Sequence, residues 1–142
     1  MSGAGGRRRK ARELALQFLY QLDLQGETDP APHVAEFWSR HALDPEAREF
    51  AEDLVRGAMA SRREIDDTIT RFTEHWALER MAAVDRNILR LAVYELGWRT
   101  ETPPKVVINE AIEIAKKFGT AESGRFINGV LDRIHRELRP AS

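Results

Sequence analysis

Five cations close to the N-terminus are the residues best suited to bind a ligand. They are Arg7, Arg8, Arg9, Lys10 and Arg12. A guanidinium presents a planar set of N–H donors that matches phosphate oxygens and stacks on bases. Cations near a helix N-terminus oppose the helix dipole, so the cluster does little for helix stability, which favours a binding role. A solvated helix end or a disordered basic arm is the alternative interpretation.

The charge is distributed unevenly along the chain. The 142 residues carry a net charge of −1, which by itself argues against a nucleic-acid ligand. Without the five cations of residues 7–12, the remainder carries −6. A concentrated positive patch can bind a polyanion despite a balanced total. The sequence therefore predicts a local binding site for phosphate.

Residue patterns for catalysis or metal binding are missing from the sequence. The four histidines are scattered and form no HExxH motif: His33, His41, His75 and His135. The sequence also lacks a GxxxxGK[ST] or GxGxxG phosphate loop and a serine in a nucleophile elbow. Asp66 and Asp67 are expected on a solvated helix face. The motif search therefore indicates no catalytic, metal-binding or phosphate-loop site.

The composition indicates the cellular compartment in which the protein acts. The chain has no cysteine, which excludes disulfides and thiolate metal sites and suits a reducing cytoplasm. It contains no run of roughly 18 apolar residues, so no membrane span is expected. The opening residues MSGAGG lack the apolar run of a signal peptide, so we expect no export. A cytoplasmic location is predicted.

The basic cluster opens a predicted helix over about residues 8–24. Its apolar residues recur with the helical period: Ala11, Leu14, Ala15, Phe18, Leu19 and Leu22. One end of this helix is suited to phosphate and the other to docking on a core. Residues 1–6 are small and glycine-rich, and we expect them to form a flexible arm. Gly26 and two prolines after it end the helix.

The middle of the chain predicts three further helices. A short amphipathic one covers about residues 33–42. An Asp-Pro pair then begins a long helix over about residues 44–73, with a kink near residues 57–63 and an apolar set that extends to Trp76. Residues 82–98 are apolar on most faces of a helix, which is typical of a central one.

Two helices complete the chain. Residues 104–118 are predicted to bury Ile108, Ala111, Ile112, Ala115 and Phe118. Residues 121–138 are predicted to bury Phe126, Ile127, Val130, Leu131 and Ile134. Gly119 and Gly124 flank what we interpret as a connection between these helices rather than a phosphate loop. No stretch alternates as a strand does, so the predicted fold class is all-α, with about seven helices in antiparallel packing.

Three stretches, in this order and spacing, resemble the NusB family of bacterial transcription antitermination factors. They are RRRKARELALQFLYQLDL at 7–24, VDRNILRLAVYEL at 84–96 and KVVINEAIEIAKKFGTAESGRFINGVLDRI at 105–134. The segments NEAIEIAKKFG and FINGVLD are the most diagnostic. The resemblance implies one helical domain over residues 7–139, built from two three-helix bundles that share a core. The N-terminal subdomain would cover about 7–76 and the C-terminal one about 77–139.

The resemblance also implies a function. Members of the family bind the boxA sequence of nascent RNA, chiefly in ribosomal RNA leaders. They do so as a heterodimer with NusE, which is also a small-subunit ribosomal protein. The complex joins other Nus factors on RNA polymerase and suppresses premature termination. The resemblance therefore implies a binding module that has no catalytic activity and no cofactor.

The family's functional positions carry over to particular residues of this sequence. The RNA contacts of the first helix correspond to Arg8, Arg9, Lys10 and Arg12. A second RNA-facing element, the start of the last helix, corresponds to Glu122, Arg125 and Phe126. The NusE-facing positions correspond to Tyr20, Glu79 and Asp85. The sequence departs from the family's pattern at Pro104 and in the run Ser123-Gly124-Arg125.

Two other interpretations stay open on the sequence. The helices could form a protein-interaction module without an RNA role, since a similar helical domain occurs fused to RNA methyltransferases. No methyltransferase residues follow Ser142 here, so catalysis of that kind is not expected. The second interpretation is a homodimer that buries the RNA surface. The sequence does not decide between these states.

Overall fold

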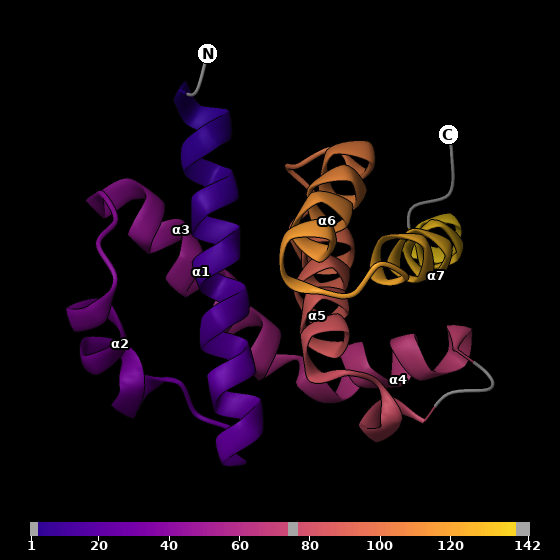
Figure 1. Ribbon diagram of the computed structural model, residues 1–142, viewed down its shortest axis with the longest axis horizontal. Helices are drawn as coiled ribbons and strands as arrows, with labels where there is room; N and C mark the ends of the chain where they lie inside the picture. The colour runs from indigo at the N-terminus through magenta and orange to yellow at the C-terminus, as the bar shows by residue number, and fades with distance from the viewer. Residues whose placement is uncertain (1–2, 74–76, 139–142) are drawn as a thin grey trace. The chain divides into compact units, whose positions relative to one another are not determined.

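The computed structural model describes the backbone of residues 3–73 and 77–138, and their side chains from Gly6 onward. Within these ranges the chain forms seven α-helices, two short 3₁₀ helices and no strand (Figure 1), which confirms the predicted all-α class. In the same ranges, every helix is too short or too polar to cross a membrane. Trp76, which was predicted to pack in the core, lies outside the described residues.

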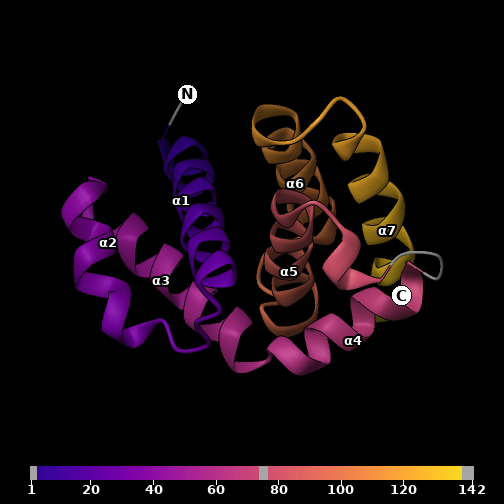
Figure 2. The same ribbon diagram turned by 60° about the horizontal axis from the view of Figure 1, so that its bottom comes forward.

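The chain divides into two compact units, Met1–Ala60 and Ser61–Ser142. The first contains α1 (Gly3–Gln25), η1 (Ala31–His33), α2 (Val34–Arg40) and α3 (Pro45–Ala60). The second contains α4 (Arg62–Phe72), η2 (Leu78–Arg80), α5 (Ala83–Trp98), α6 (Pro104–Phe118) and α7 (Ser123–Leu138). This division falls before the subdomain boundary expected near residue 76, because α4 packs against α5 and α7 (Figure 2).

In the first unit, α1 is anchored along its apolar stripe and packs against α3. Leu14, Phe18 and Leu22 are at most 2% exposed, as the helical period predicted. The helix begins at Gly3 instead of near residue 8, so it extends into the segment expected to be a flexible arm. It ends at Gln25 and is followed by Gly26, whose φ of +70° lies in the left-handed region that suits a residue without a Cβ.

The start of α3 follows the predicted Asp-Pro signal. The Asp44 carboxylate accepts a hydrogen bond from the Ala47 amide at 3.2 Å, which caps the helix. The predicted long helix is divided into α3 and α4, because the chain turns at Ser61, with φ −106° and ψ 21°. This turn lies inside residues 57–63, the interval in which a kink was predicted.

In the second unit, α5 is the central helix, as predicted. It packs against α4, α6 and α7. Leu89, Val93 and Leu96 have no exposed surface. A helix that is apolar on most faces needs neighbours on several sides, and three helices provide them here. The bounds of α6 agree with the predicted helix, and α7 begins at Ser123 instead of near residue 121.

The buried face of α6 differs from the predicted stripe. Three residues that were expected inside are only half-buried: Ile108, Ile112 and Phe118. Val107 and Ile114 are buried instead, at 1% and 4% exposed. On α7, Phe126 is half-buried, whereas the rest of the predicted stripe is buried. The apolar period of α6 was therefore correct. More apolar residues fit that period than are buried, and the packing of neighbouring helices determines which of them are buried.

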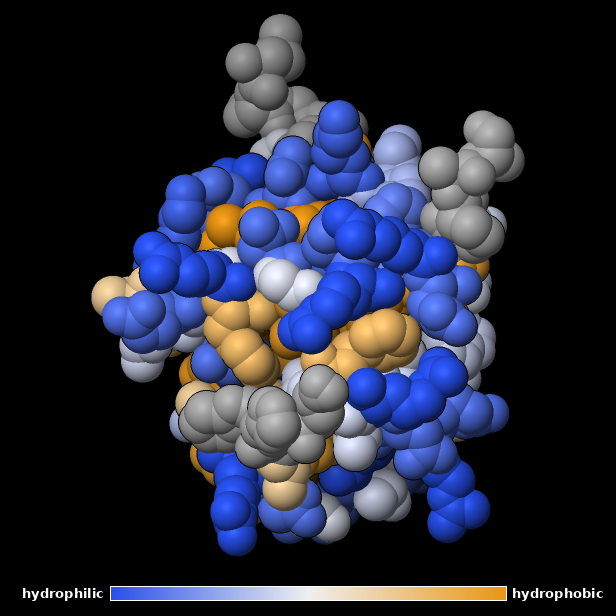
Figure 3. Space-filling model, turned by 90° about the vertical axis from the view of Figure 1, so that its right-hand side faces the viewer, coloured by the Kyte–Doolittle hydropathy of each residue, from blue (hydrophilic) through white to orange (hydrophobic). Residues whose placement is uncertain are grey.

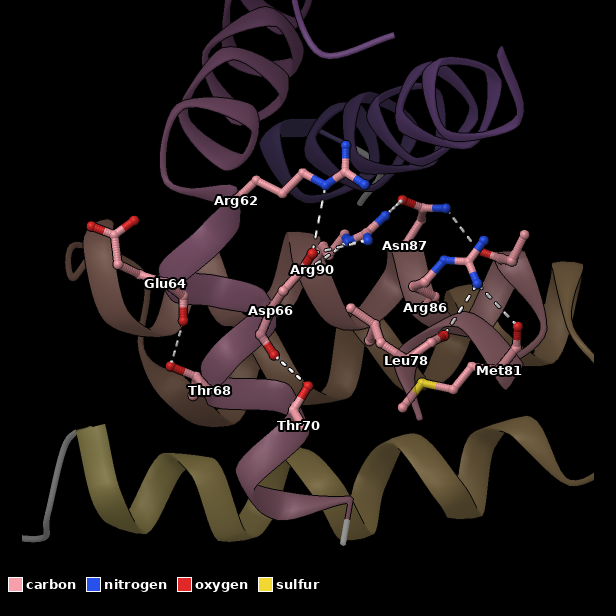
Figure 4. Close-up of polar contacts among 11 residues, drawn as sticks. Arg62, Glu64, Asp66, Thr68, Thr70, Leu78, Met81, Arg86, Asn87 and Arg90 are labelled. Carbon is pink, nitrogen blue, oxygen red and sulfur yellow. Dashed lines mark hydrogen bonds and ion pairs between the residues drawn. The ribbon is translucent and has the colours of Figure 1, made fainter. Parts of the chain in front are cut away.

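A polar network joins α4 to α5. Arg90 donates two hydrogen bonds to the Asp66 carboxylate, from Nε at 2.8 Å and from Nη2 at 3.1 Å (Figure 4). The Arg90 side chain is 6% exposed and that of Asp66 is 21% exposed. The prediction of a solvated pair was wrong for Asp66, because α4 turns this carboxylate toward α5, while Asp67 is exposed.

Candidate nucleic-acid interface

The first turns of α1 present four cations to solvent. Arg7, Arg8, Arg9 and Lys10 are exposed, and we call them the basic tip. An α-helix has 3.6 residues per turn, so four consecutive side chains point around its whole circumference. The basic tip can therefore contact phosphates on more than one side of α1.

Phe50 of α3 positions two arginines of α1. The guanidinium carbon of Arg8 lies 4.1 Å from the centroid of the Phe50 ring, and that of Arg12 lies 5.2 Å from it. Residues four apart share one face of a helix, and this face of α1 meets α3. The negative face of an aromatic ring attracts a cation by electrostatics. Unlike a carboxylate, the ring does not occupy the N–H donors of the guanidinium with strong hydrogen bonds. Arg8 is thus held in place while its N–H groups stay suited to a ligand.

Arg12 lies deeper than an RNA contact would. It is 6% exposed, whereas Arg8 on the same face is exposed. A buried guanidinium does not reach a phosphate in solvent without a rearrangement of the residues around it. The structure therefore places Arg12 beneath the basic tip and not on its exposed surface, which differs from the position that the sequence implied.

A hollow of about 120 Å³ lies beside the basic tip at the start of α3. Its lining includes Arg7, Arg8 and the exposed carboxylate of Glu46. A carboxylate repels a phosphate, so this side of the basic tip is the less favourable one for RNA. Glu46 therefore lowers the positive potential at Arg7 and Arg8, whereas Arg9 and Lys10 do not line this hollow.

The turn between α6 and α7 is fixed by Ser123. This residue is 1% exposed, and its hydroxyl accepts a hydrogen bond from the Thr120 amide at 2.9 Å. Gly119 lies so close that a Cβ there would collide with the Ser123 hydroxyl. The absence of a side chain at Gly119 therefore allows the chain to fold back tightly, and the first turn of α7 is held in one position.

This turn places the second set of predicted RNA contacts. Glu122 and Arg125 are exposed and Phe126 is half-buried. The Phe126 amide donates to the Glu122 carbonyl at 3.1 Å, so these residues belong to one helical turn. Figure 3 shows the side of the second unit on which α7 lies, where hydrophilic side chains cover most of the surface. The element thus offers one cation, one carboxylate and part of an aromatic ring.

The predicted partner-binding positions lie on three elements. Tyr20 of α1 is 36% exposed, and Leu24, one turn further, is 62% exposed, so the two form an apolar edge. Glu79 is exposed in η2, and Asp85 is half-buried in the first turn of α5. Tyr20 belongs to the first unit, while Glu79 and Asp85 belong to the second.

Asp85 contains a buried oxygen that lacks a donor. Within the described ranges, its Oδ1 has no hydrogen-bond partner. Burying such a polar atom without a partner costs about 1–3 kcal/mol. The neighbouring Arg86 holds η2 against α5, because its Nη1 donates to the carbonyls of Leu78 and Met81 at 3.2 Å each (Figure 4).

Sequence reasoning missed two supporting residues. Phe50 was an ordinary apolar position of its helix, and only the packing of α1 on α3 reveals that it holds arginines. Arg90 gave a usable signal, since a charged residue inside an apolar helix needs a partner when it is buried. Among the described residues, no group of three or more His, Asp or Glu side chains is arranged to hold a metal ion.

The fold and the basic tip together define a small all-helical protein whose exposed cations suit a polyanionic ligand. A family model described as the NusB family matches residues 9–136. This match covers most of the chain, and the chain belongs to the NusB family. The family resemblance predicted from the three sequence stretches is thereby confirmed.

Curated relatives and solved structures agree with this assignment. The transcription antitermination protein NusB of Anaeromyxobacter sp. (strain Fw109-5) is 54% identical, over 94% of this chain and 93% of that protein. The T. maritima NusB structure has a TM-score of 0.85 and 42% identity, over 94% of this chain and 93% of that chain. A structure of antitermination factors NusB and NusE in complex with dsRNA matches with a TM-score of 0.82 and 33% identity, over 92% of this chain and 97% of that chain.

Proposed function

We propose that this protein is a transcription antitermination factor that binds the boxA sequence of nascent ribosomal transcripts together with NusE and prevents premature termination. The observation that carries this proposal is the basic tip, whose exposed cations stand on a helix anchored in a core. The relatives named as antitermination proteins and the NusB–NusE complex with RNA support it. In this proposal the protein acts in the cytoplasm, on RNA polymerase with other Nus factors, and catalyses no reaction.

The basic tip supplies the first set of RNA contacts. Arg8, Arg9 and Lys10 bind phosphates, and Arg12 supports Arg8 from below through their common contact with Phe50. Phosphate contacts give affinity and fix the position of the strand, but they carry no sequence information. The choice of boxA must therefore come from other groups and from NusE.

The start of α7 supplies the second set. Arg125 is exposed and suited to phosphate, and the half-buried ring of Phe126 offers a surface on which an unstacked base can pack. Glu122 cannot bind phosphate, since its carboxylate is an acceptor, so in this proposal it accepts hydrogen bonds from base amino groups. Base contacts of this kind discriminate between sequences.

NusE binds at Tyr20, Glu79 and Asp85 in this proposal. The apolar edge of Tyr20 and Leu24 suits a protein partner, because exposed aromatic and aliphatic side chains gain from burial at an interface. The exposed carboxylate of Glu79 suits a donor from the partner. These contacts would position NusE to complete the recognition of boxA.

Retention of a boxA RNA on filters over a salt series tests the function. If about four cations contact phosphates, log affinity falls with log salt at a slope of about −3, since each neutralised phosphate on a single strand contributes roughly 0.7. NusE should raise the affinity for boxA RNA more than for a scrambled RNA of the same composition. Retention that ignores salt, or no retention even with NusE, would contradict the proposal.

The exposed side chains of Tyr20, Leu24 and Trp98 favour a second candidate, a protein-interaction module without an RNA role. Binding of NusE with no change in RNA retention would support this candidate.

Sedimentation at several protein concentrations tests the homodimer that the sequence left open. A mass that rises with concentration, together with loss of RNA retention, would identify a dimer that buries the RNA surface.

A further inference from the structure

A hollow of about 520 Å³ opens in the second unit between the end of α6 and the start of α7. Its volume falls within the range of sites that hold small ligands. The residues that matter for its chemistry are Ile112, Lys116, Thr120, Gly124, Arg125 and Asn128. Apart from Arg125, none of them belongs to the positions that the family resemblance assigned to RNA. The hollow therefore adds new groups to this part of the molecule.

The rim of the hollow carries two cations. Lys116 and Arg125 are both exposed and come from different helices. The Lys116 ammonium lies 3.3 Å from a carboxylate oxygen of Glu113, and both side chains of this pair are well exposed, at 66% and 44%. Exposed pairs of this type contribute little and exchange readily, so Lys116 stays available to a phosphate.

The remaining lining suits a base. Asn128 is exposed and offers an amide that both donates and accepts hydrogen bonds, as base edges do. The Thr120 hydroxyl adds a small polar group, although it already contacts the Ser123 hydroxyl at 3.2 Å. The half-buried side chain of Ile112 gives the hollow an apolar wall against which a flat ring can pack.

Gly124 keeps the hollow open. A Cβ at this position would lie 3.7 Å from Cγ2 of Ile112 and 4.0 Å from Cγ of Lys116, which are ordinary contact distances. A methyl group therefore fits, but a longer side chain would extend over Ile112 into the space of the hollow. The position thus controls the volume without being needed for the path of the backbone.

We propose that this hollow holds one unstacked nucleotide of the bound RNA. Its phosphate would lie at Lys116 and Arg125, its ring against Ile112, and its base edge at Asn128. The inference rests on the proposed RNA function and deepens it, because a base held here supplies sequence choice that the basic tip lacks.

Filling the hollow tests the inference. Gly124→Leu should weaken binding of a boxA RNA in the presence of NusE by about tenfold, the order of one lost base contact. Gly129→Leu is the matched control, because Gly129 lies on the same helix, is exposed, and has no atom within 4 Å of an added Cβ. Gly129→Leu leaves the hollow unfilled but stands one turn after Arg125 and Phe126, so it measures what added bulk on α7 costs outside the hollow. Gly124→Leu should bind RNA about tenfold more weakly than Gly129→Leu. Gly124→Ala adds only ordinary contacts and should give a smaller loss of RNA affinity. This variant keeps the inference testable if Gly124→Leu does not fold.

A scan of boxA RNAs, each with one base removed, completes the experiment. Removal of one particular base should weaken RNA binding to the unaltered protein by the same factor as Gly124→Leu does. Removal of that base should not weaken RNA binding to the Gly124→Leu variant any further. Equal RNA affinities of the Gly124→Leu and Gly129→Leu variants would overturn the nucleotide site and leave the RNA function intact. Absence of RNA binding by the unaltered protein would instead overturn the proposed function. A loss of NusE binding in Gly124→Leu at unchanged RNA affinity would assign the hollow to a protein ligand and also overturn the inference.

Discussion

Arg8 and Arg90 have the same side chain, but different groups hold them. Arg90 is 5% exposed and is bound by the Asp66 carboxylate, and its Nη1 donates to the Asn87 side-chain oxygen at 3.1 Å. Arg8 is exposed and lies over the Phe50 ring. A carboxylate engages the N–H donors of a guanidinium, whereas a ring attracts its charge and leaves the donors oriented outward. The comparison shows that an arginine bound by a carboxylate, such as Arg90, stabilises the fold, whereas an arginine held by a ring, such as Arg8, can still bind a ligand.

The difference in burial explains why the two partners are not interchangeable. A guanidinium removed from water needs an opposite charge with good geometry, because its desolvation cost is large. Asp66 meets this need with two hydrogen bonds of 2.8 and 3.1 Å. An exposed guanidinium keeps its water, so a weak contact with a ring is sufficient to restrict its position. The same carboxylate at the basic tip would compete with phosphate.

The largest expected effect is on stability, from Arg90→Ala. Removing one partner of a buried ion pair leaves the other without its charge, and we expect unfolding in urea to require about 3 kcal/mol less free energy. RNA affinity measured where the variant is folded should not change. Arg62→Ala is the control, because its Nε lies 3.5 Å from the same Asp66 carboxylate but its side chain is 32% exposed. It should cost about 0–1 kcal/mol. Equal stability of the two variants would remove the contrast with Arg8.

The next largest effect is on RNA binding, from Arg9→Ala combined with Lys10→Ala. We expect affinity for boxA RNA to fall on the order of tenfold and the salt slope to become less steep by about 1.4, because two phosphate contacts are lost. The melting temperature should stay nearly the same, since both side chains are exposed. Arg133→Ala with Arg136→Ala removes two exposed cations from later turns of α7 and is the control. A large drop in melting temperature would mark the basic tip as structural.

The smallest expected effect comes from Phe50→Leu, which removes the ring but keeps an apolar side chain. RNA affinity should fall about two- to fivefold, which corresponds to a cation–ring contact of about 0.5–1 kcal/mol. The same change in an Arg8→Ala background should have little further effect, because both substitutions remove one interaction. Phe72→Leu is the control, since Arg71 lies 5.6 Å over that ring in α4. Additive losses for Phe50→Leu and Arg8→Ala would show that the ring does not position Arg8.

Much of the fold was predictable because helices carry local signals. The Asp44 cap, the glycine after α1 and the apolar period of α5 each predicted an element that the structure contains. The predictions failed where several local answers were acceptable. The helix over residues 44–73 could continue or turn at Ser61, and α6 had more apolar positions than its neighbours could cover. In both places the packing of other helices determined the outcome, namely the turn at Ser61 and the buried face of α6.

The candidate site shows the same limit at the level of single side chains. The cations of residues 7–12 were found from the sequence, and the family resemblance implied RNA contacts for Arg8, Arg9, Lys10 and Arg12. Burial of Arg12 followed from the packing of α1 on α3. Its spacing from Ala15 and Leu19 places it on the buried stripe, but its charge argued for an exposed position. The hollow at the start of α7 was also invisible, because it is formed by residues from two helices whose relative rotation the sequence does not state.

By itself the sequence determined that the chain is helical, where most helices begin and end, and that positive charge gathers at the start of the first one. These properties depend on the apolar period and on residues close together in the chain. Only the tertiary structure decided which arginines serve the fold and which face a ligand, and where Gly124 leaves space beside Ile112. These depend on contacts between distant residues, and the same local pattern is compatible with several such contacts.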